Sequence, residues 1–168
     1  ATPNDNGPVW WISNLGSNSN DGSQASPLAD LRSAFDIISN KGGKNDTIKI
    51  QPGNYTGDRN HSFEPGSYTF QSPESISIVI MGMGSNPSEV VFSGNEDNYR
   101  GFIEVPPFKK ATFQNFTIRQ MFNGSDDKSG GAAIAYRRNN SDLLVDNMRF
   151  INNRVHQSSY HSGGGAIY

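Results

Sequence analysis

The amino-acid sequence predicts an all-β fold, a β-solenoid in which short strand-rich units stack on one another. Two stretches near its end, 111–136 and 144–168, are versions of one another, and 113–120 aligns with 145–152 at an offset of 32 positions. A period of about 20 to 50 residues is typical of arrays whose units cover each other's apolar faces. Apolar and polar residues alternate in 143–151, which indicates strands and not helices.

Composition bounds both the fold and the partners. The 168 residues fit one domain, and 18 of them are glycines, which suit many tight turns. The absence of cysteine excludes disulfides, thiolate metal sites and cysteine nucleophiles. A net charge of −2 gives no basic field, so we expect no nucleic-acid partner. No apolar run approaches the roughly 20 residues of a membrane-spanning helix, so we expect no membrane span.

Residues 1–45 are predicted to form an N-terminal cap of one strand, one polar loop and one amphipathic helix. The strand contains Trp10 and Trp11, which face opposite ways, so at most one of them is free to bind a ligand. The helix is predicted to begin after an N-cap at Ser26 and to end at Gly42. Its apolar face is formed by Leu28, Leu31, Phe35 and Ile38. Such a cap covers the unpaired backbone groups of the first strand.

Residues 46–168 are predicted to form the stacked units, continuous with the cap in one domain. The first units are strands closed by glycine turns, at 47–57, 75–84 and 90–95. The repeat itself occupies the last third of the chain and stops in mid-pattern at Tyr168. The native chain is therefore expected to continue.

Two segments of the first third, 23–35 and 46–57, resemble the opening of right-handed parallel β-helix proteins of the pectate-lyase-like superfamily. This resemblance implies that the solenoid is a right-handed parallel β-helix with an N-terminal cap.

The last third resembles the repeats of polymorphic outer-membrane proteins and related surface proteins. Phe150 and Asn153 fit their FxxN motif, and residues 164–167 fit their GGA(I/L/V) motif. These repeats build the extracellular parts of adhesins, so the resemblance implies a surface role. The motif residues are Phe150, Asn153, Gly164, Gly165, Ala166 and Ile167.

Asn115 and Asn147 occupy equivalent places directly after a strand of the repeat. Stacked asparagines at such a bend can hydrogen-bond to one another along the stack, as a ladder. We expect both residues to be structural.

Six Asn-x-Ser/Thr sequons point to secretion and N-glycosylation in a eukaryotic pathway. Asn115 is the weakest acceptor, because a side chain that bonds within a ladder cannot carry a glycan. The favoured acceptors lie in polar, turn-like stretches, and they are Asn54, Asn60, Asn123 and Asn139, followed by Asn45.

No catalytic or metal-binding cluster is predicted, and no cofactor. The acidic candidates are the pairs Glu96-Asp97 and Asp126-Asp127 and the single residues Asp142 and Asp146, which are typical of solvated turns. His156 and His161 have no third metal ligand beside them. The chain also lacks the Gly-x-Ser-x-Gly motif of a serine nucleophile.

Three classes of function remain. The first is an extracellular or cell-surface structural or adhesive protein that self-associates into a fibre or coat, or binds cell-surface glycans and proteins. The second is the N-terminal part of a β-helix polysaccharide lyase or hydrolase. The third is a non-catalytic glycan- or protein-binding module that uses exposed aromatics such as Tyr99, Tyr136 and Tyr160. We expect the first, a non-enzymatic protein.

Overall fold

The structure is a computed structural model. It describes residues 9–61, 63, 75–94, 101–105, 108–123, 132–136, 142–155 and 165–167.

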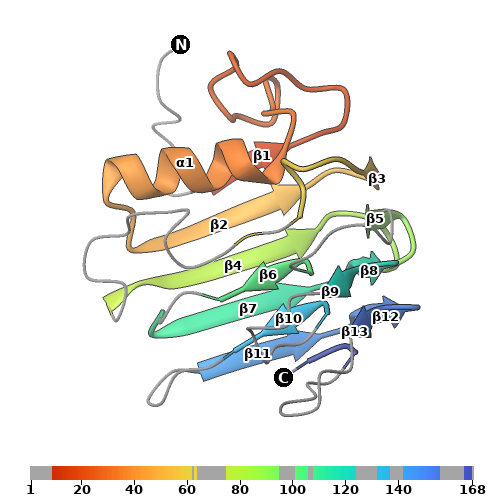
Figure 1. Cartoon of the computed structure of the whole chain (residues 1–168). Helices are drawn as coiled ribbons and strands as arrows, with labels where there is room; N and C mark the ends of the chain where they lie inside the picture. Colours follow the sequence, from red (N-terminus) through yellow and green to blue (C-terminus); the bar gives the residue numbers. More distant parts are fainter. Residues whose placement is uncertain are drawn as a thin grey trace.

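Two parallel sheets form the body of the molecule (Figure 1). The five-stranded sheet has the order β1 (Val9–Ile12), β2 (Asn45–Ile50), β4 (Ser77–Gly82), β7 (Lys110–Gln114) and β11 (Asp142–Asp146). The four-stranded sheet has the order β12 (Arg149–Ile151), β8 (Thr117–Arg119), β5 (Val90–Ser93) and β3 (Gly53–Tyr55). Two short sheets pair β10 (Ile134–Ala135) with β6 (Ile103–Glu104), and β13 (Arg154–Val155) with β9 (Phe122–Asn123).

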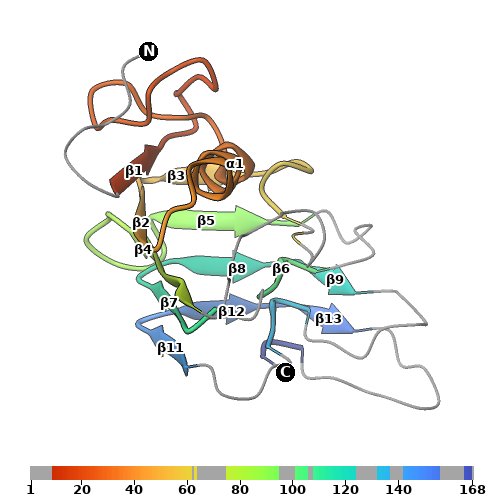
Figure 2. The same ribbon diagram turned by 90° about the vertical axis from the view of Figure 1, so that its left-hand side faces the viewer.

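The chain visits the two large sheets in turn, and each visit adds one strand to the same side of each sheet. Equivalent residues therefore lie in rows across the strands. One row runs from Ile48 through Ile80 and Phe113 to Val145. A matching row of the four-stranded sheet runs from Tyr55 through Phe92 and Ile118 to Phe150. Figure 2 shows β5, β8 and β12 following one another below the helix.

The predicted fold class is wrong. Over its described residues the chain is neither all-β nor a right-handed parallel β-helix or β-solenoid. These residues form a mixed α/β fold with parallel sheets of five and four strands and one helix. Among the described residues no closed sheet joins these strands. The reason is that a sequence repeat predicts only that equivalent residues lie side by side in parallel strands. Separate open sheets satisfy this condition as well as a β-solenoid does.

The helix, α1 (Leu31–Lys41), begins later than predicted. Its N-cap is Asp30, whose side chain accepts a hydrogen bond from the backbone N–H of Ser33, and not Ser26. Leu28 forms a parallel bridge with Ile12 and so cannot belong to the helix. The helix ends where predicted, because Gly42 is its C-cap and adopts a left-handed conformation with φ 63°.

One hydrophobic cluster fills the molecule, from Trp10 near the start to Ile134. The apolar stripe of α1 packs into it through buried Leu31, Ala34, Phe35 and Ile38. Aromatic rings continue the core between the sheets, where Tyr55 stacks on Phe92 with 5.0 Å between ring centroids.

Trp10 and Trp11 face opposite ways. Trp10 is buried and donates through Nε1 to Asp46 Oδ2 at 2.7 Å. Trp11 is half-buried, with the Lys49 ammonium 5.3 Å from its ring centroid. The two tryptophans therefore form no joint stacking platform for a sugar.

Candidate functional site

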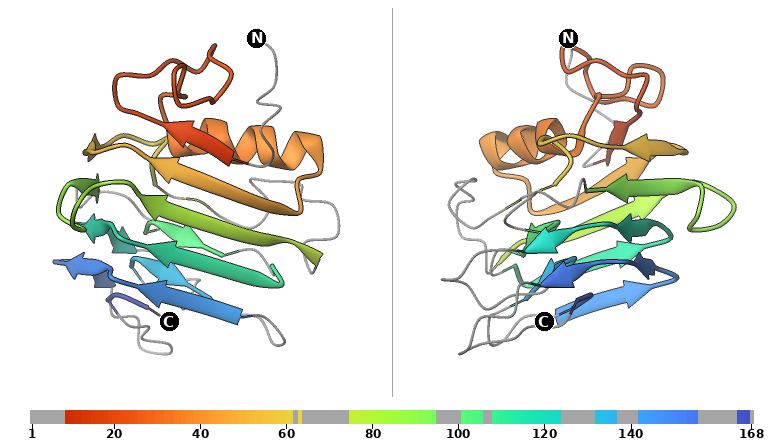
Figure 3. Two further views of the ribbon diagram at one scale, coloured as in Figure 1. Left: turned by 180° about the vertical axis from the view of Figure 1, so that it is seen from behind. Right: turned by 45° about the vertical axis from the view of Figure 1, so that its right-hand side comes forward.

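The outer edge of β1 is closed by the loop that precedes α1. The N–H of Trp11 donates to the carbonyl of Gly22 at 2.7 Å, and the N–H of Ser13 donates to the carbonyl of Leu28 at 2.9 Å. Leu28 N–H donates in return to the carbonyl of Trp11. Gly16 lets the loop pass this closely, because a Cβ there would collide with the carbonyl oxygen of Leu28. Figure 3 shows this loop and α1 together at one end of the five-stranded sheet.

The outer edge of β11, at the opposite end of that sheet, has no paired strand among the residues that the structure describes. Asp142 N–H donates to Lys109, and the carbonyl of Asp146 accepts from Asn115, so both ends of β11 face β7. Backbone groups alternate in direction along a strand, so the N–H and C=O groups of Leu143 and Val145 face away from β7. Within the described residues no strand pairs with them.

Side chains at this end are less buried than their equivalents further up the stack. Ile80 and Phe113 are each 1% exposed, but Val145 in the same row is only half-buried. Ile118 is fully buried, and Phe150 beside it is half-buried. The open end is thus an incompletely covered continuation of the core.

Two carboxylates flank this open edge. Asp142 lies opposite Lys110 of β7, and Asp146 lies opposite Gln114, whose Nε2 donates to Asp146 Oδ2 at 3.0 Å. Both aspartates are exposed. A basic or amide side chain therefore stands opposite each carboxylate within the existing sheet.

Asparagines hold the bends that follow β7 and β11. Asn115 and Asn147 have positive φ, 60° and 49°, a conformation that Asn tolerates better than most residues. Asn115 Nδ2 donates to the carbonyls of Gly82 and Gly84, each at 2.9 Å. Asn147 Nδ2 donates to Asn115 Oδ1, also at 2.9 Å. Each bend is thereby tied to the one before it.

Asn153, the asparagine of the FxxN motif, holds a second bend to the equivalent bend of the preceding repeat. Asn153 Oδ1 accepts from the N–H of Met121 at 3.0 Å, and Asn153 Nδ2 donates to the carbonyl of Ile118 at 2.9 Å. Phe150 packs against the core. Among the GGAI residues, Ile167 forms a bridge with Ile134, and Gly165 lies against the carbonyl of Asn153; Gly164 lies outside the described residues.

A shallow groove of about 400 Å³ follows the Asn115–Asn147 bend. Met81 and Met83 supply apolar surface, and polar groups come from Ser85, Gln114 and Asp146. A mostly polar lining with two methionine side chains suits a hydroxyl-rich ligand.

The predicted glycan acceptors differ in their surroundings. Asn45 and Asn54 are exposed on β2 and β3. Asn60 is 7% exposed, and its amide is engaged on both sides, because Oδ1 accepts from Leu31 N–H and Nδ2 donates to the Thr56 carbonyl. We therefore remove Asn60 from the proposed acceptors. The side chain of Asn123 and all of Asn139 lie outside the described residues.

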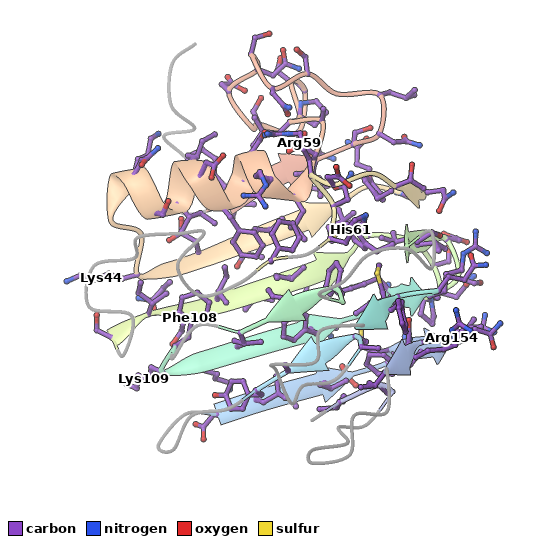
Figure 4. All side chains as sticks on the ribbon, in the orientation of Figure 1. Lys44, Arg59, His61, Phe108, Lys109 and Arg154 are labelled. Atoms are coloured by element: carbon purple, nitrogen blue, oxygen red, sulfur yellow. The ribbon has the colours of Figure 1, made fainter. Side chains whose placement is uncertain are left out.

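Three titratable side chains near the helix have shifted pKa values. Burial raises the pKa of Asp46 above its usual value, against the opposing effects of Trp10 and nearby Lys41. Burial would also raise the pKa of Asp30, but hydrogen bonds from Arg59, Asn18 and Ser33 outweigh it and lower that pKa. Burial lowers the pKa of His61. Figure 4 places Arg59 beside the start of α1, and Arg154 towards the open end.

None of these side chains forms a catalytic or metal-binding cluster. No group of three or more His, Asp or Glu side chains that could hold a metal occurs in the described parts of the chain. Asp142 and Asp146 lie at the two ends of β11, four positions and so roughly 13 Å apart, beyond the spacing of glycosidase carboxylate pairs.

Several predicted candidates lie outside the described residues: Glu96-Asp97, Asp126-Asp127, His156, His161, Tyr99 and Tyr160. Tyr136 is half-buried and packs against the core.

No protein-family model matches this chain, and neither a curated protein nor a solved structure is detectably similar to it. The resemblance to pectate-lyase-like and outer-membrane repeat proteins therefore stays a prediction. In the described part of the chain, no helix combines the length and the apolarity needed to cross a membrane.

The sequence predicted a cap over the first strand, but it did not show that the loop before α1 makes the hydrogen bonds to β1. It also missed the role of Asp30. Asp30 carried a readable signal, because it directly precedes the apolar-periodic stretch that starts at Leu31.

Proposed function

We propose that this chain is a non-enzymatic extracellular or cell-surface protein with a structural or adhesive role. The observation that carries the proposal is the regular stack of parallel strands, whose successive bends are held together by asparagine side chains. A stacked array of this kind presents an extended surface for binding other proteins.

The six sequons support the extracellular location. Two of the sequon asparagines, Asn45 and Asn54, are exposed and thus accessible to a glycosyltransferase.

Filament growth by stacking β1 of one copy on the open end of the next is disfavoured. The N–H groups of Trp11 and Ser13 already donate to the covering loop, so a second chain would have to displace that loop first. The fibre that the sequence analysis anticipated would need a different contact.

Binding to immobilised extracellular-matrix proteins and to cell-surface glycans tests the proposal. We expect the chain to bind at least one of them and to leave it chemically unchanged. The Leu15→Lys variant, at a side chain that is 92% exposed on the loop that covers β1, should retain this binding. Cleavage of a polysaccharide by the purified chain would contradict the non-enzymatic assignment.

The groove beside Met81 and Met83 favours a second candidate, a module that binds neutral carbohydrate. A glycan panel tests it, with Met83→Asp as the variant, since Met83 is 39% exposed at the groove. Loss of binding to a specific glycan with Met83→Asp but not with Leu15→Lys would support the groove. No binding to any glycan would remove this candidate.

A further inference from the structure

Arginine side chains gather on the outer face of the four-stranded sheet. Phe150 of β12 packs against the core, so its neighbour Arg149 faces outward, because successive side chains of a strand point to opposite faces. Ile118 of β8 is fully buried, so its neighbour Arg119 faces outward as well. Arg149 pairs with Thr117 in the parallel register. Arg119 is therefore a diagonal neighbour of Arg149 on the same face, with roughly 8 Å between their Cβ atoms.

Arg119 is held in position by side-chain hydrogen bonds that cross three strands. Its Nε donates to Ser93 Oγ of β5 at 2.7 Å, and Ser93 Oγ donates to Asn54 Oδ1 of β3 at 3.1 Å. The terminal nitrogens of the guanidinium have no partner among the described residues. A guanidinium that is already oriented loses less side-chain entropy when it binds an anion.

Arg154 continues the series of arginines beyond the bend that follows β12. Val155 of β13 packs against the core, so Arg154 faces outward. Its guanidinium carbon lies 5.4 Å from the centroid of the Phe122 ring. Figure 2 shows β13 following β12, and β9 following β8, along one side of the molecule. The three arginines therefore lie along successive strands and do not surround one point.

The positive charge of this face is not neutralised locally. Among the described residues, neither Arg119 nor Arg149 forms an ion pair with a carboxylate. The whole chain carries a net charge of −2, so the arginine face differs in sign from the molecule. Its exposure does not depend on what lies beside β12, because a strand added there would extend the sheet without covering its outer face.

We infer that this face binds a sulfated polysaccharide, whose repeated sulfate groups pair with Arg119, Arg149 and Arg154. Arginine binds oxyanions through parallel N–H donors, and a sulfate ester offers the same kind of oxygens as a phosphate. Arginines that follow one another along strands suit a linear ligand with repeated charges better than a single small anion. The inference rests on the proposed function, because an extracellular location selects sulfated polysaccharides among the linear polyanions.

Nucleic acid, another linear polyanion, fits this face less well. Surfaces that bind single-stranded nucleic acid combine positive charge with aromatic rings on which bases stack. Among the described residues, the aromatic ring beside these arginines is that of Phe122, and Arg154 already lies over it. The face therefore offers charge without a free stacking surface.

Titration of the full chain with heparin, a sulfated polysaccharide, tests the inference. The comparison ligands are hyaluronan, which carries carboxylates but no sulfate, and a single-stranded DNA. The test variant combines Arg119→Gln with Arg149→Gln. The matched control combines Lys44→Gln with Lys109→Gln, which removes the same charge at two exposed positions. Figure 4 places both lysines on the side of the molecule opposite Arg154.

We expect the original chain and the lysine variant to bind heparin alike, and the arginine variant to bind it about tenfold more weakly. Hyaluronan and DNA should bind the original chain more weakly than heparin does. Added salt should weaken heparin binding more steeply for the original chain than for the arginine variant, because the original chain makes more ionic contacts. Circular dichroism checks that both variants are folded.

The outcomes that contradict the inference differ in what they say about the proposed function. Equal affinity of the folded arginine and lysine variants for heparin would overturn the inference, and so would hyaluronan or DNA that binds as tightly as heparin. If the chain binds a matrix protein or another glycan but not heparin, the inference fails and the proposed function stands. If the chain binds none of these ligands, both fail.

Discussion

Asn115 combines two roles in one side chain. It adopts a left-handed backbone conformation, with φ 60°, and its amide bonds the carbonyls of Gly82 and Gly84 in the preceding bend. It also accepts from Asn147 in the following bend. Few side chains tolerate a positive φ and also carry both a hydrogen-bond donor and an acceptor. Asparagine does both, which explains its presence at this bend.

Replacing Asn115 separates these roles. We expect Asn115→Ala to lower the free energy of unfolding by about 2 to 4 kcal/mol, because it loses the amide hydrogen bonds and strains the backbone. Asn115→Gly should cost about 1 kcal/mol less than Asn115→Ala, because glycine adopts positive φ freely. Urea unfolding of both variants provides the measurement. Equal loss in the two would show that backbone conformation contributes nothing at this position.

The glycan acceptors can be separated in the same way. In a eukaryotic secretory host, we expect Asn54→Gln to remove one glycan from the intact mass. Asn60→Gln should leave the mass of glycan unchanged and instead lower the free energy of unfolding by about 1 to 3 kcal/mol, because the buried Asn60 amide bonds Leu31 and Thr56. A glycan on Asn60 in the folded protein would contradict this assignment.

Asp46 should make the stability depend on pH. Its pKa is raised by burial, so the folded state holds the proton more tightly than the unfolded state does. Its contribution is therefore fully present at low pH and is lost as the pH rises from about 3.8 through the raised pKa. We expect the stability of Asp46→Asn relative to the original protein to increase across this window and then level off. Parallel stability curves, measured by urea unfolding at several pH values, would exclude a raised pKa.

At the scale of elements, the start of α1 is the best-defined local interaction. Asp30 accepts hydrogen bonds from Ser33, Asn18 and Arg59, the last at 2.7 Å. This side chain joins the helix to the loop that closes β1 and to the segment after β3. One residue thus holds together three parts of the closed end.

Asp30→Ala should lower the free energy of unfolding by about 1 to 3 kcal/mol, through loss of the N-cap and of the bond to Arg59. Ser26→Ala is the matched control, because Ser26 precedes the helix without capping it, and it should change stability by less than about 0.5 kcal/mol. Thermal unfolding followed by circular dichroism measures both. A larger effect of Ser26→Ala would restore the N-cap that the sequence predicts.

Strand pairing was the part of the fold that the sequence could predict. The alignment of 113–120 with 145–152 corresponds to pairing of β7 with β11 and of β8 with β12 in that register. The fold class could not be predicted, because the period does not distinguish a coil from separate open sheets. The helix start was missed because Leu28, apolar and in phase with the helix, is held by Ile12 instead.

The candidate site was less predictable than the strands. Asn115, Asn147 and Asn153 stand out by their spacing, so their stacked positions follow from the repeat. The difference between the two edges depends on a loop whose hydrogen bonds are made by backbone atoms of Gly22 and Leu28. Backbone groups are common to all residues, and the sequence marks this contact only indirectly, for example by Gly16, where a Cβ would collide with the carbonyl oxygen of Leu28.

For the whole molecule, the two ends of the five-stranded sheet have opposite properties. One end is closed by a loop and a helix. At the other end, β11 has no paired strand among the described residues, and its half-buried apolar side chains lie between two carboxylates. This polarity of the sheet is the central structural claim.

Amide hydrogen exchange of the free protein at low concentration, resolved by residue with NMR, tests this polarity most directly. We predict slow exchange at Trp11 and Ser13, which donate to the covering loop, and at Ala111 and Phe113, which lie inside the sheet. Leu143 and Val145, at the equivalent places on β11, should exchange much faster. Slow exchange at Leu143 and Val145, or fast exchange at Trp11 and Ser13, would contradict the assignment of a closed and an open edge.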